Sequence, residues 1–465
     1  MSTNSITLRP VGPLDAEITP PGSKSITNRA LAIAGVANGV SVLEGALDCE
    51  DTQMMMNALR VLGVEVVHSP EDARIRVAGS GGKLPKLRAD EVMHVALAAP
   101  AGYSIAQQTA SHFYLECGNS GTTLRFLTAM CAVGEGTFTL DGVPRMRQRP
   151  VGDLVSGLRQ LGARVECPTL KTPCPPVTVY ANGLRGGTAK ISGSISSQFL
   201  SGILMAAVHA KEETRIQVLG DLVSRPYIDM TISVMRAFGG SVRPVTPTAE
   251  HVTAEFLLAP GQRYRAAHYV IEPDASAASY FFAAAAVVGG RVKVRNLSKN
   301  ALQGDVRFCE CLAKMGCGVE YLPNGIVVSR NPESPLHGVE ADMHDISDTA
   351  RTLAVTALFA DSPTRIRNVA NMRLKETDRI RAVCTELRKF GAVVEEFEDG
   401  MTIHPLSADS LKNWEKNVEI ETYNDHRMAM SFAAAGLRLP GVSICDPECT
   451  AKTYPHFFED FSRLG

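Results

Sequence analysis

The 465-residue sequence has few aromatic residues, almost no net charge and no long apolar run. Phe, Trp and Tyr make up 6% of the chain, and with 45% hydrophobic and 21% charged residues the composition is that of an ordinary globular protein. The net charge of -2 argues against a nucleic-acid partner, because affinity for a polyanion normally requires a basic excess. No apolar run approaches the length of a membrane-spanning helix, so we expect no membrane partner.

The eleven cysteines lack the spacing of a zinc site or of a disulfide scaffold. The closest pair, "CEC" at Cys309 and Cys311, is not a CxxC motif, and no HExxH motif occurs. The first residues show neither the apolar core of a signal peptide nor the composition of a transit peptide. We therefore expect no metal, and a cytoplasmic protein with reduced cysteines.

The common glycine-rich phosphate motifs are also missing. "GSKS" resembles the end of a Walker A loop, but Ser23 separates Gly22 from Lys24. "GGTAKISGS" near Gly186 lacks the GxGxxG spacing of dinucleotide folds. The sequence predicts no nucleotide cofactor.

What the chain does contain is a repeat. Six segments place one or two polar residues before a run of Ala, Leu, Met and Phe long enough for a buried helix: "SKSITNRALAIAGVA", "GNSGTTLRFLTAMCAV", "GSISSQFLSGILMAAV", "PDASAASYFFAAAAVV", "ISDTARTLAVTALFA" and "YNDHRMAMSFAAAGL". They lie about 70 to 95 residues apart, so each repeat must hold several elements.

A second feature gives the same number of repeats. Five helical segments end in a glycine that precedes a strand-like run, and a sixth ends the chain as "FSRLG"; the five glycines are Gly63, Gly162, Gly239, Gly316 and Gly391. Glycine after a last apolar turn is typical of the left-handed residue that ends a helix. The pattern predicts six α/β units.

The starts of the six apolar helices allow two interpretations. Ser, Thr, Asn or Asp there is expected for simple N-capping, worth about 1 kcal/mol each. Capping does not explain the larger polar side chains that follow, and the cations among them oppose the helix dipole unless an anion compensates. These residues are Lys24, Arg29, Arg125, Gln198, Arg351, His426 and Arg427. Several such helix N-termini, if they face one cleft, would together bind phosphates and carboxylates.

Nine motifs in order, from about Pro20 to Pro455, resemble the 5-enolpyruvylshikimate-3-phosphate synthases of the enolpyruvyl transferase family. They are "PGSKSITNRA", "GNSGTTLRF", "PRMRQRP", "GSISSQFLSG", "SRPYIDMT", "DASAASYFFAAAA", "NMRLKETDRI", "YNDHRMAMSF" and "TAKTYP". The resemblance implies a two-domain inside-out α/β barrel with three α/β units per domain. It implies a first domain of residues 22–272, a second of 1–21 plus 273–465, and an active site in the cleft between them.

The resemblance also implies the reaction. Enzymes of this family transfer the enolpyruvyl group of phosphoenolpyruvate to the 5-hydroxyl of shikimate 3-phosphate and release phosphate, without metal or cofactor and typically as monomers. Matching residues for phosphoenolpyruvate are Lys24, Asn119, Gly121, Arg149, Gln198, Arg379, Arg427 and Lys452. Those for shikimate 3-phosphate are Lys24, Ser25, Arg29, Ser196, Ser197, Gln198, Ser224, Tyr227, Asp348, Asn371 and Lys375.

Acid–base roles are assigned by the same match. Asp348 would exchange the proton of the 5-hydroxyl and Glu376 that of the methylene carbon, with Lys24 and Lys375 as alternative donors. On spacing alone, Glu376 would be expected to pair with Arg379 three residues later. Asp425 could orient a neighbouring cation or cap a helix.

Two other functions remain to be compared. The related transferase that acts on UDP-N-acetylglucosamine usually carries a reactive Cys before an Arg-Pro pair, and "DGVPRMRQRP" contains none. A non-catalytic anion sensor would be expected to lose Asp348 and Glu376, which are present.

Three features depart from the family. The stretch between Lys83 and Leu115 is longer than expected, and a surface loop or an extra helix is the default expectation. Ser120 and Phe126 replace the Ala and Pro of many members. Glyphosate, which inhibits much of the family at the phosphoenolpyruvate site, has room beside Gly121, but the neighbouring changes leave its potency open.

Overall fold

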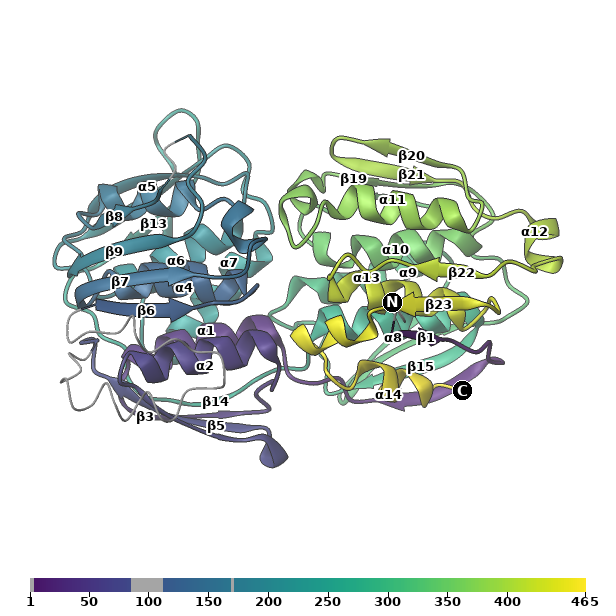
Figure 1. The fold of residues 1–465 in the computed structure, drawn as a ribbon, viewed down its shortest axis with the longest axis horizontal. Coiled ribbons are helices and arrows are strands. Elements are labelled where there is room, and N and C mark those ends of the chain that lie inside the picture. Colours follow the sequence, from purple (N-terminus) through teal and green to yellow (C-terminus); the bar gives the residue numbers. More distant parts are fainter. Residues whose placement is uncertain (1–3, 85–111, 169–170) are drawn as a thin grey trace. The chain divides into compact units, whose positions relative to one another are not determined.

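The computed structural model describes residues 4–84, 112–168 and 171–465. Their contacts divide the chain into two compact units (Figure 1). The central unit is Gly22–Ile271, and the terminal unit combines Met1–Pro21 with Glu272–Gly465. The unexplained stretch after Lys83 falls mostly on residues 85–111, outside the described residues.

The central unit contains three four-stranded sheets of one topology. In each sheet one edge pair is parallel and the other neighbours are antiparallel. Their strand orders are β14 (His268–Val270), β3 (Asn38–Glu44), β5 (Arg74–Ser80) and β4 (Glu65–Ser69); β6 (His112–Glu116), β7 (Glu135–Asp141), β9 (Val177–Asn182) and β8 (Arg164–Glu166); and β10 (Gly187–Ser192), β11 (Thr214–Leu219), β13 (Val252–Leu258) and β12 (Arg243–Val245).

Two sheets of the terminal unit repeat this topology and its third sheet has three strands, and both ends of the chain contribute strands. β2 (Leu14–Ile18) pairs with β15 (Gly290–Arg295), and β1 (Ser5–Thr7) pairs with β23 (Val442–Cys445), so residues before Pro21 complete two of its sheets. The strand orders are β16 (Gly318–Leu322), β17 (Gly325–Arg330), β15 (Gly290–Arg295) and β2 (Leu14–Ile18); β18 (Glu340–Asp342), β19 (Thr364–Arg367), β21 (Gly400–Ile403) and β20 (Val394–Phe397); and β1 (Ser5–Thr7), β23 (Val442–Cys445) and β22 (Val418–Ile420).

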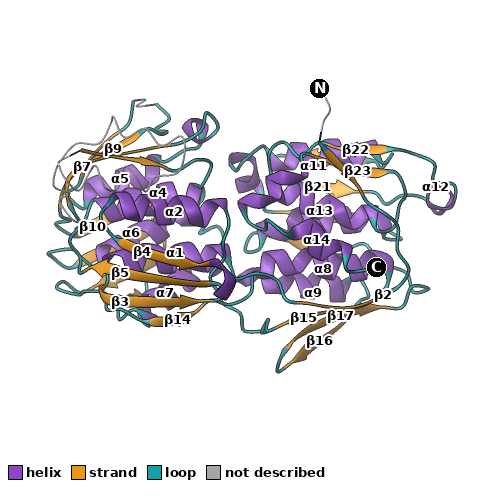
Figure 2. Ribbon diagram, turned by 60° about the horizontal axis from the view of Figure 1, so that its bottom comes forward, coloured by secondary structure: helices purple, strands orange, loops and turns teal. Residues whose placement is uncertain are grey.

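Within each unit the helices lie inside and the sheets outside (Figure 2). The innermost helices are the six predicted apolar segments, buried along almost their whole length because they carry so few polar side chains: α1 (Lys24–Val36), α4 (Gly121–Cys131), α6 (Ser197–Ala207), α8 (Ala275–Val288), α10 (Ala350–Thr356) and α13 (His426–Gly436). A second helix of each repeat buries only one side: α2 (Glu50–Val61), α5 (Gly152–Gln160), α7 (Pro226–Ala237), α9 (Phe308–Lys314), α11 (Arg379–Lys389) and α14 (Phe457–Ser462). The predicted six α/β units, three per domain, are confirmed.

Short elements connect these repeats. They are α12 (Ala408–Lys412) and the 3₁₀ helices η1 (Pro70–Asp72), η3 (Met146–Gln148), η4 (Gly304–Arg307), η5 (Ser347–Thr349), η6 (Ala357–Phe359), η7 (Ala370–Leu374) and η8 (Pro447–Lys452). No helix in the described ranges is long and apolar enough to span a bilayer. All eleven cysteines are free thiols.

Five of the six innermost helices begin with a side-chain cap, as predicted. Ser23, Ser120, Ser196, Asp274 and Asp425 each accept a hydrogen bond from a backbone N–H of the first turn. The prediction is wrong for the fifth helix. There η5 leads into α10 without a side-chain cap, because Ile346 before η5 has no polar side chain and the hydroxyl of Thr349 before α10 donates to Ile346 O at 2.9 Å.

The predicted glycine turns are also present. All five glycines have φ between 81° and 99°, where a side chain would be strained. In four of them the next N–H bonds back to the helix, for example Val64 N to Leu59 O at 3.0 Å, which closes a Schellman turn.

Candidate active site

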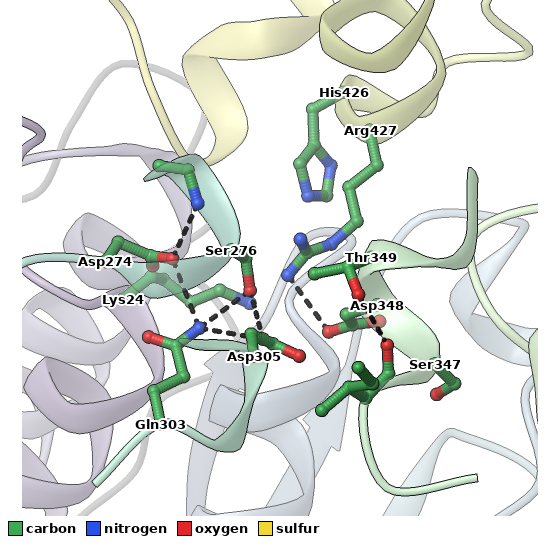
Figure 3. A network of polar contacts seen from close by, with 12 residues as sticks. Lys24, Asp274, Ser276, Gln303, Asp305, Ser347, Asp348, Thr349, His426 and Arg427 are labelled. Atoms are coloured by element: carbon green, nitrogen blue, oxygen red, sulfur yellow. Dashed lines mark hydrogen bonds and ion pairs between the residues drawn. The ribbon is translucent and has the colours of Figure 1, made fainter. Parts of the chain in front are cut away.

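In the terminal unit, charged side chains gather where α10, α11 and α13 begin. Asp348 lies on η5, immediately before α10, and Arg379 and Arg427 lie in the first turns of α11 and α13. Arg427 Nη2 donates to Asp348 Oδ2 at 2.9 Å (Figure 3), and Arg379 Nη1 to Asp348 Oδ1 at 3.4 Å. The structure therefore brings together residues that are up to 79 positions apart in the sequence.

Arg379 is the centre of this cluster. Its Nε and Nη2 donate to Asp425 at 2.5 and 3.1 Å, and Nη2 also lies 2.7 Å from Glu376 Oε2. Three carboxylates thus surround one buried guanidinium, which raises the pKa of Arg379 although burial alone would lower it. Arg379 is held in one place and stays charged.

Both roles considered for Asp425 are fulfilled. One oxygen accepts Arg427 N at 3.0 Å, which caps α13, and the same carboxylate binds Arg379. Asp425 has no exposed surface. Asp425, the N-cap residue of α13, therefore also holds Arg379, the first residue of α11, in place.

Glu376 bridges two cations. Its Oε2 contacts Arg379, as the three-residue spacing predicted, and its Oε1 accepts Lys452 Nζ at 3.0 Å. Lys452 ends η8, 76 residues away, and is 5% exposed. The sequence spacing predicted the contact of Glu376 with Arg379, whereas its contact with Lys452 is seen only in the tertiary structure.

Asp348 is ionised in this environment. Burial would raise the pKa of Asp348, but Arg427, Lys375, Arg379 and Arg351 outweigh it and hold that pKa far below its usual range. Five cations accompany three carboxylates in this part of the described structure: Arg351, Lys375, Arg379, Arg427 and Lys452 against Asp348, Glu376 and Asp425. Such an excess of positive charge suits a polyanionic ligand.

Neutral polar groups complete this cluster. Asn371 is buried and donates through Nδ2 to Ser347 at 3.3 Å. Burial, with Arg427 and Lys452 nearby, holds the pKa of His426 well below its usual range, so its ring is neutral at neutral pH. Beside them, Asp274 at the start of α8 accepts from Ala277 N and from Gln303 (Figure 3).

In the central unit, α1, α4 and α6 present their first turns together. Asn28 of α1 donates to Thr122 of α4 at 2.8 Å, and Arg125 of α4 donates to Gln198 of α6 at 2.6 Å. Lys24, the first residue of α1, pairs with Asp51 of α2 at 3.0 Å. Sequence analysis missed Asp51; its signal is the acidic pair that opens α2.

Arg149 lies against Asn119 and Gly121. Its Nη1 donates to Asn119 O at 3.1 Å and to Oδ1 at 3.3 Å. A Cβ on Gly121 would lie 2.7 Å from Arg149 Nη2. Three predicted phosphoenolpyruvate residues are therefore neighbours here, and the absent side chain of Gly121 makes room for the guanidinium.

Arg29 occupies a different environment. It is 1% exposed, between the rings of Phe126 and Tyr227, and donates to Ser25 O at 2.8 Å and Thr231 Oγ1 at 2.7 Å. Its donors are engaged by the protein. The geometry therefore favours a role in positioning Ser25 and Tyr227 over direct contact with a ligand.

The remaining predicted residues of this unit lie at turns and helix starts. Ser196 caps α6, Ser197 and Gln198 follow it, and Ser224 has a φ of 55° just before α7. Tyr227 N donates to Ser224 O at 3.0 Å. Among the described residues, no group of His, Cys, Asp and Glu could hold a metal ion.

Comparisons with known proteins identify the family. A family model described as EPSP synthase (3-phosphoshikimate 1-carboxyvinyltransferase) matches residues 8–99 and 87–461. The chain is 44% identical over 452 residues to the 3-phosphoshikimate 1-carboxyvinyltransferase of Nostoc punctiforme, covering 97% of both chains. It is 43% identical over 463 residues to the enzyme of the same name from Sulfurovum, covering 99% of both.

A solved structure is also similar. The EPSP synthase of Acinetobacter baumannii superposes with a TM-score of 0.76 at 26% identity, covering 100% of this chain and 98% of that one. The family model, the relatives and the fold agree over nearly the whole length, and the chain belongs to the EPSP synthase (3-phosphoshikimate 1-carboxyvinyltransferase) family.

Proposed function

We propose that this protein transfers the enolpyruvyl group of phosphoenolpyruvate to the 5-hydroxyl of shikimate 3-phosphate, releasing phosphate. The observation that carries the proposal is the cluster around Asp348 and Glu376, in which two ionisable carboxylates are held by an excess of cations. The reaction requires proton exchange next to polyanions, and this cluster provides groups of both kinds. The product serves chorismate and aromatic amino acid biosynthesis.

We assign phosphoenolpyruvate binding to cations and neutral polar residues of both units. In the terminal unit we assign Arg379, Arg427 and Lys452, because they belong to a cluster in which five cations accompany three carboxylates. In the central unit we assign Lys24, Asn119, Gly121, Arg149 and Gln198, which surround the first turns of α1, α4 and α6. An arginine guanidinium can donate two parallel hydrogen bonds to a phosphate or a carboxylate, whereas the ammonium group of Lys24 acts as a compact point charge.

Shikimate 3-phosphate would bind to hydroxyl and amide groups as well as cations. The assigned residues are Lys24, Ser25, Arg29, Ser196, Ser197, Gln198, Ser224, Tyr227, Asp348, Asn371 and Lys375. Ser196 and Ser197 lie at the start of α6, where backbone N–H groups favour an anion. For Arg29 we propose an indirect contribution, through Ser25 and Tyr227.

The chemistry is an addition followed by an elimination. In the addition, a proton reaches the methylene carbon of phosphoenolpyruvate, the 5-hydroxyl oxygen bonds to its neighbouring carbon, and the hydroxyl loses its proton. The elimination removes a proton from the new methyl group as the C–O bond to phosphate breaks. We assign the hydroxyl proton to Asp348 and the carbon-bound proton to Glu376, with Lys24 and Lys375 as alternative donors.

Two alternatives are less well supported. A transferase acting on UDP-N-acetylglucosamine would be expected to carry a cysteine in the loop from Asp141 to Pro150, where none occurs. A non-catalytic anion sensor gives no reason to keep Asp348 and Glu376 among the cations. We further propose that the protein is a cytoplasmic monomer. Sedimentation of the purified chain would test the monomeric state, and cell fractionation would test the location.

The test is phosphate release from phosphoenolpyruvate with shikimate 3-phosphate, with UDP-N-acetylglucosamine, or with no acceptor. We expect release only with shikimate 3-phosphate, reduced about 10²–10⁴-fold in Glu376→Gln. Glu396→Gln is the matched control, because Glu396 pairs with Arg373 outside the cluster. Release with the nucleotide sugar would contradict the proposal, and binding without turnover would favour the sensor.

A further inference from the structure

Arg351 is a buried cation to which the reaction as proposed gives no role. It lies near the start of α10 and has no exposed surface. Its Nη2 donates to the backbone O of Asp348 at 2.6 Å, while Nε and Nη1 have no hydrogen-bond partner. Burying a guanidinium with two unused donor atoms costs free energy, so packing gives no reason for its presence.

Arg351 differs from the other two arginines beside Asp348 in what it binds. Arg379 and Arg427 donate to the Asp348 carboxylate, and both are assigned to phosphoenolpyruvate. Arg351 instead holds the backbone of Asp348, and its Nη2 lies 3.9 Å from Oδ1. The Asp348 side chain is 18% exposed and Arg351 is 0% exposed, so a ligand can reach the carboxylate without reaching Arg351.

The charges around Asp348 come from every element packed against it. Four cations act on it directly: Arg351 on α10, Lys375 after η7, Arg379 at the start of α11 and Arg427 at the start of α13. The groups that contact these cations or each other are Glu376, Asp425 and His426 beside α11 and α13, Lys452 on η8 and Tyr280 on α8. A bound phosphate and carboxylate would neutralise Arg379 and Arg427. Asp348 would then lose the two cations that hold its carboxylate oxygens.

We propose that Arg351 is a positioning residue for Asp348, which keeps this carboxylate in place and ionised once the substrate has engaged Arg379 and Arg427. The inference rests on the proposed function. The backbone hydrogen bond fixes the η5 turn that carries Asp348. The buried charge lies close to the carboxylate, where the low dielectric makes its attraction strong.

The test is the pH dependence of kcat in Arg351→Met, which keeps the bulk of the side chain and removes its charge. Without the charge, ionised Asp348 is less stable, so its pKa rises and activity is lost at a higher pH. We expect the acid limb of the kcat profile to move upward by about one pH unit. The KM for phosphoenolpyruvate should stay within about two-fold, because Arg351 does not touch the substrate.

Two further variants separate charge from packing. Arg351→Lys retains the charge and should keep the acid limb of the wild-type protein. Arg438→Met removes an arginine that donates to Val287 O at 2.9 Å and binds no carboxylate, so it should lose stability without moving the limb. An unchanged limb in Arg351→Met would overturn the proposal.

Folding failures are informative as well. If Arg351→Met and Arg351→Gln both failed to fold while Arg351→Lys folded, Arg351 would be a residue of the core, which also overturns the proposal. A wild-type protein without shikimate 3-phosphate-dependent turnover would instead refute the proposed function. The two failures are therefore distinguishable.

Discussion

The guanidinium of Arg149 lies against the position that a side chain on Gly121 would occupy. A Cβ there would come within 2.7 Å of Nη2 and 3.0 Å of Cζ, and within 3.1 Å of Arg125 Nη1. We predict that Gly121→Ala pushes Arg149 aside and raises the KM for phosphoenolpyruvate about tenfold, a loss of about 1.4 kcal/mol. The KM for shikimate 3-phosphate should change less.

A matched glycine tests whether the effect is local. Gly12 has no atom within 4 Å of an added Cβ, so Gly12→Ala should leave both KM values unchanged. Steady-state kinetics with each substrate varied in turn would measure the difference. Equal effects of the two substitutions would show that Gly121 does not act through Arg149.

Asp425→Asn should separate helix capping from charge pairing. Asn caps a helix about as well as Asp, so α13 should still form. Arg379 would lose one of its three carboxylate partners, and we expect a loss of about 3 kcal/mol in the free energy of unfolding together with lower kcat/KM. Urea unfolding and turnover would measure the two effects.

The control for that experiment is Asp378→Asn. Asp378 caps α11 and pairs with Arg373, but its side chain is 38% exposed. We expect its loss to cost less than about 1 kcal/mol. If the two variants had the same free energy of unfolding, burial would not be the reason why the pair of Asp425 and Arg379 stabilises the protein.

Arg29→Lys tests the positioning role of Arg29. Lysine cannot serve the carbonyl of Ser25 and the hydroxyl of Thr231 at the same time, so a buried group would be left without its partner. We predict a loss of about 2–4 kcal/mol in unfolding free energy and a higher KM for shikimate 3-phosphate. Arg225→Lys, at a side chain that is 64% exposed, should change stability by less than about 0.5 kcal/mol. An effect on KM with full stability would point to direct ligand contact.

His209 should make the protein less stable in acid. Burial, and Arg263 nearby, lower the pKa of His209 to about 4 from 6.5. The unfolded chain therefore binds this proton more readily, and stability is lost as pH falls from about 6.5 to about 4, by up to about 3 kcal/mol. In His209→Phe this part of the pH dependence should disappear from urea unfolding curves. A curve with the same slope over that range would contradict the assignment.

Sequence determined the repeats because their signals are local. A small polar residue before an apolar run, and a glycine after the last turn, fix where helices begin and end through the backbone of a few residues. Five of six starts and all five internal glycine turns follow these rules. The exception is the fifth start, where Ile346 offers no polar side chain and the hydroxyl of Thr349 donates to the carbonyl of Ile346.

Most contacts between the charged residues could not be predicted from the sequence and are known only from the tertiary structure. The spacing of Glu376 and Arg379 was readable, since three residues bring side chains together at a helix start. The contacts of Glu376 with Lys452, of Asp348 with Arg427 and of Lys24 with Asp51 join separate helices, and no local pattern encodes them. The order of motifs indicated the family, while packing alone decided that Arg29 and Arg351 are buried behind the residues they hold. The physical reason is that the charge state of a group depends on how many charges and how little water surround it, which only the tertiary structure sets.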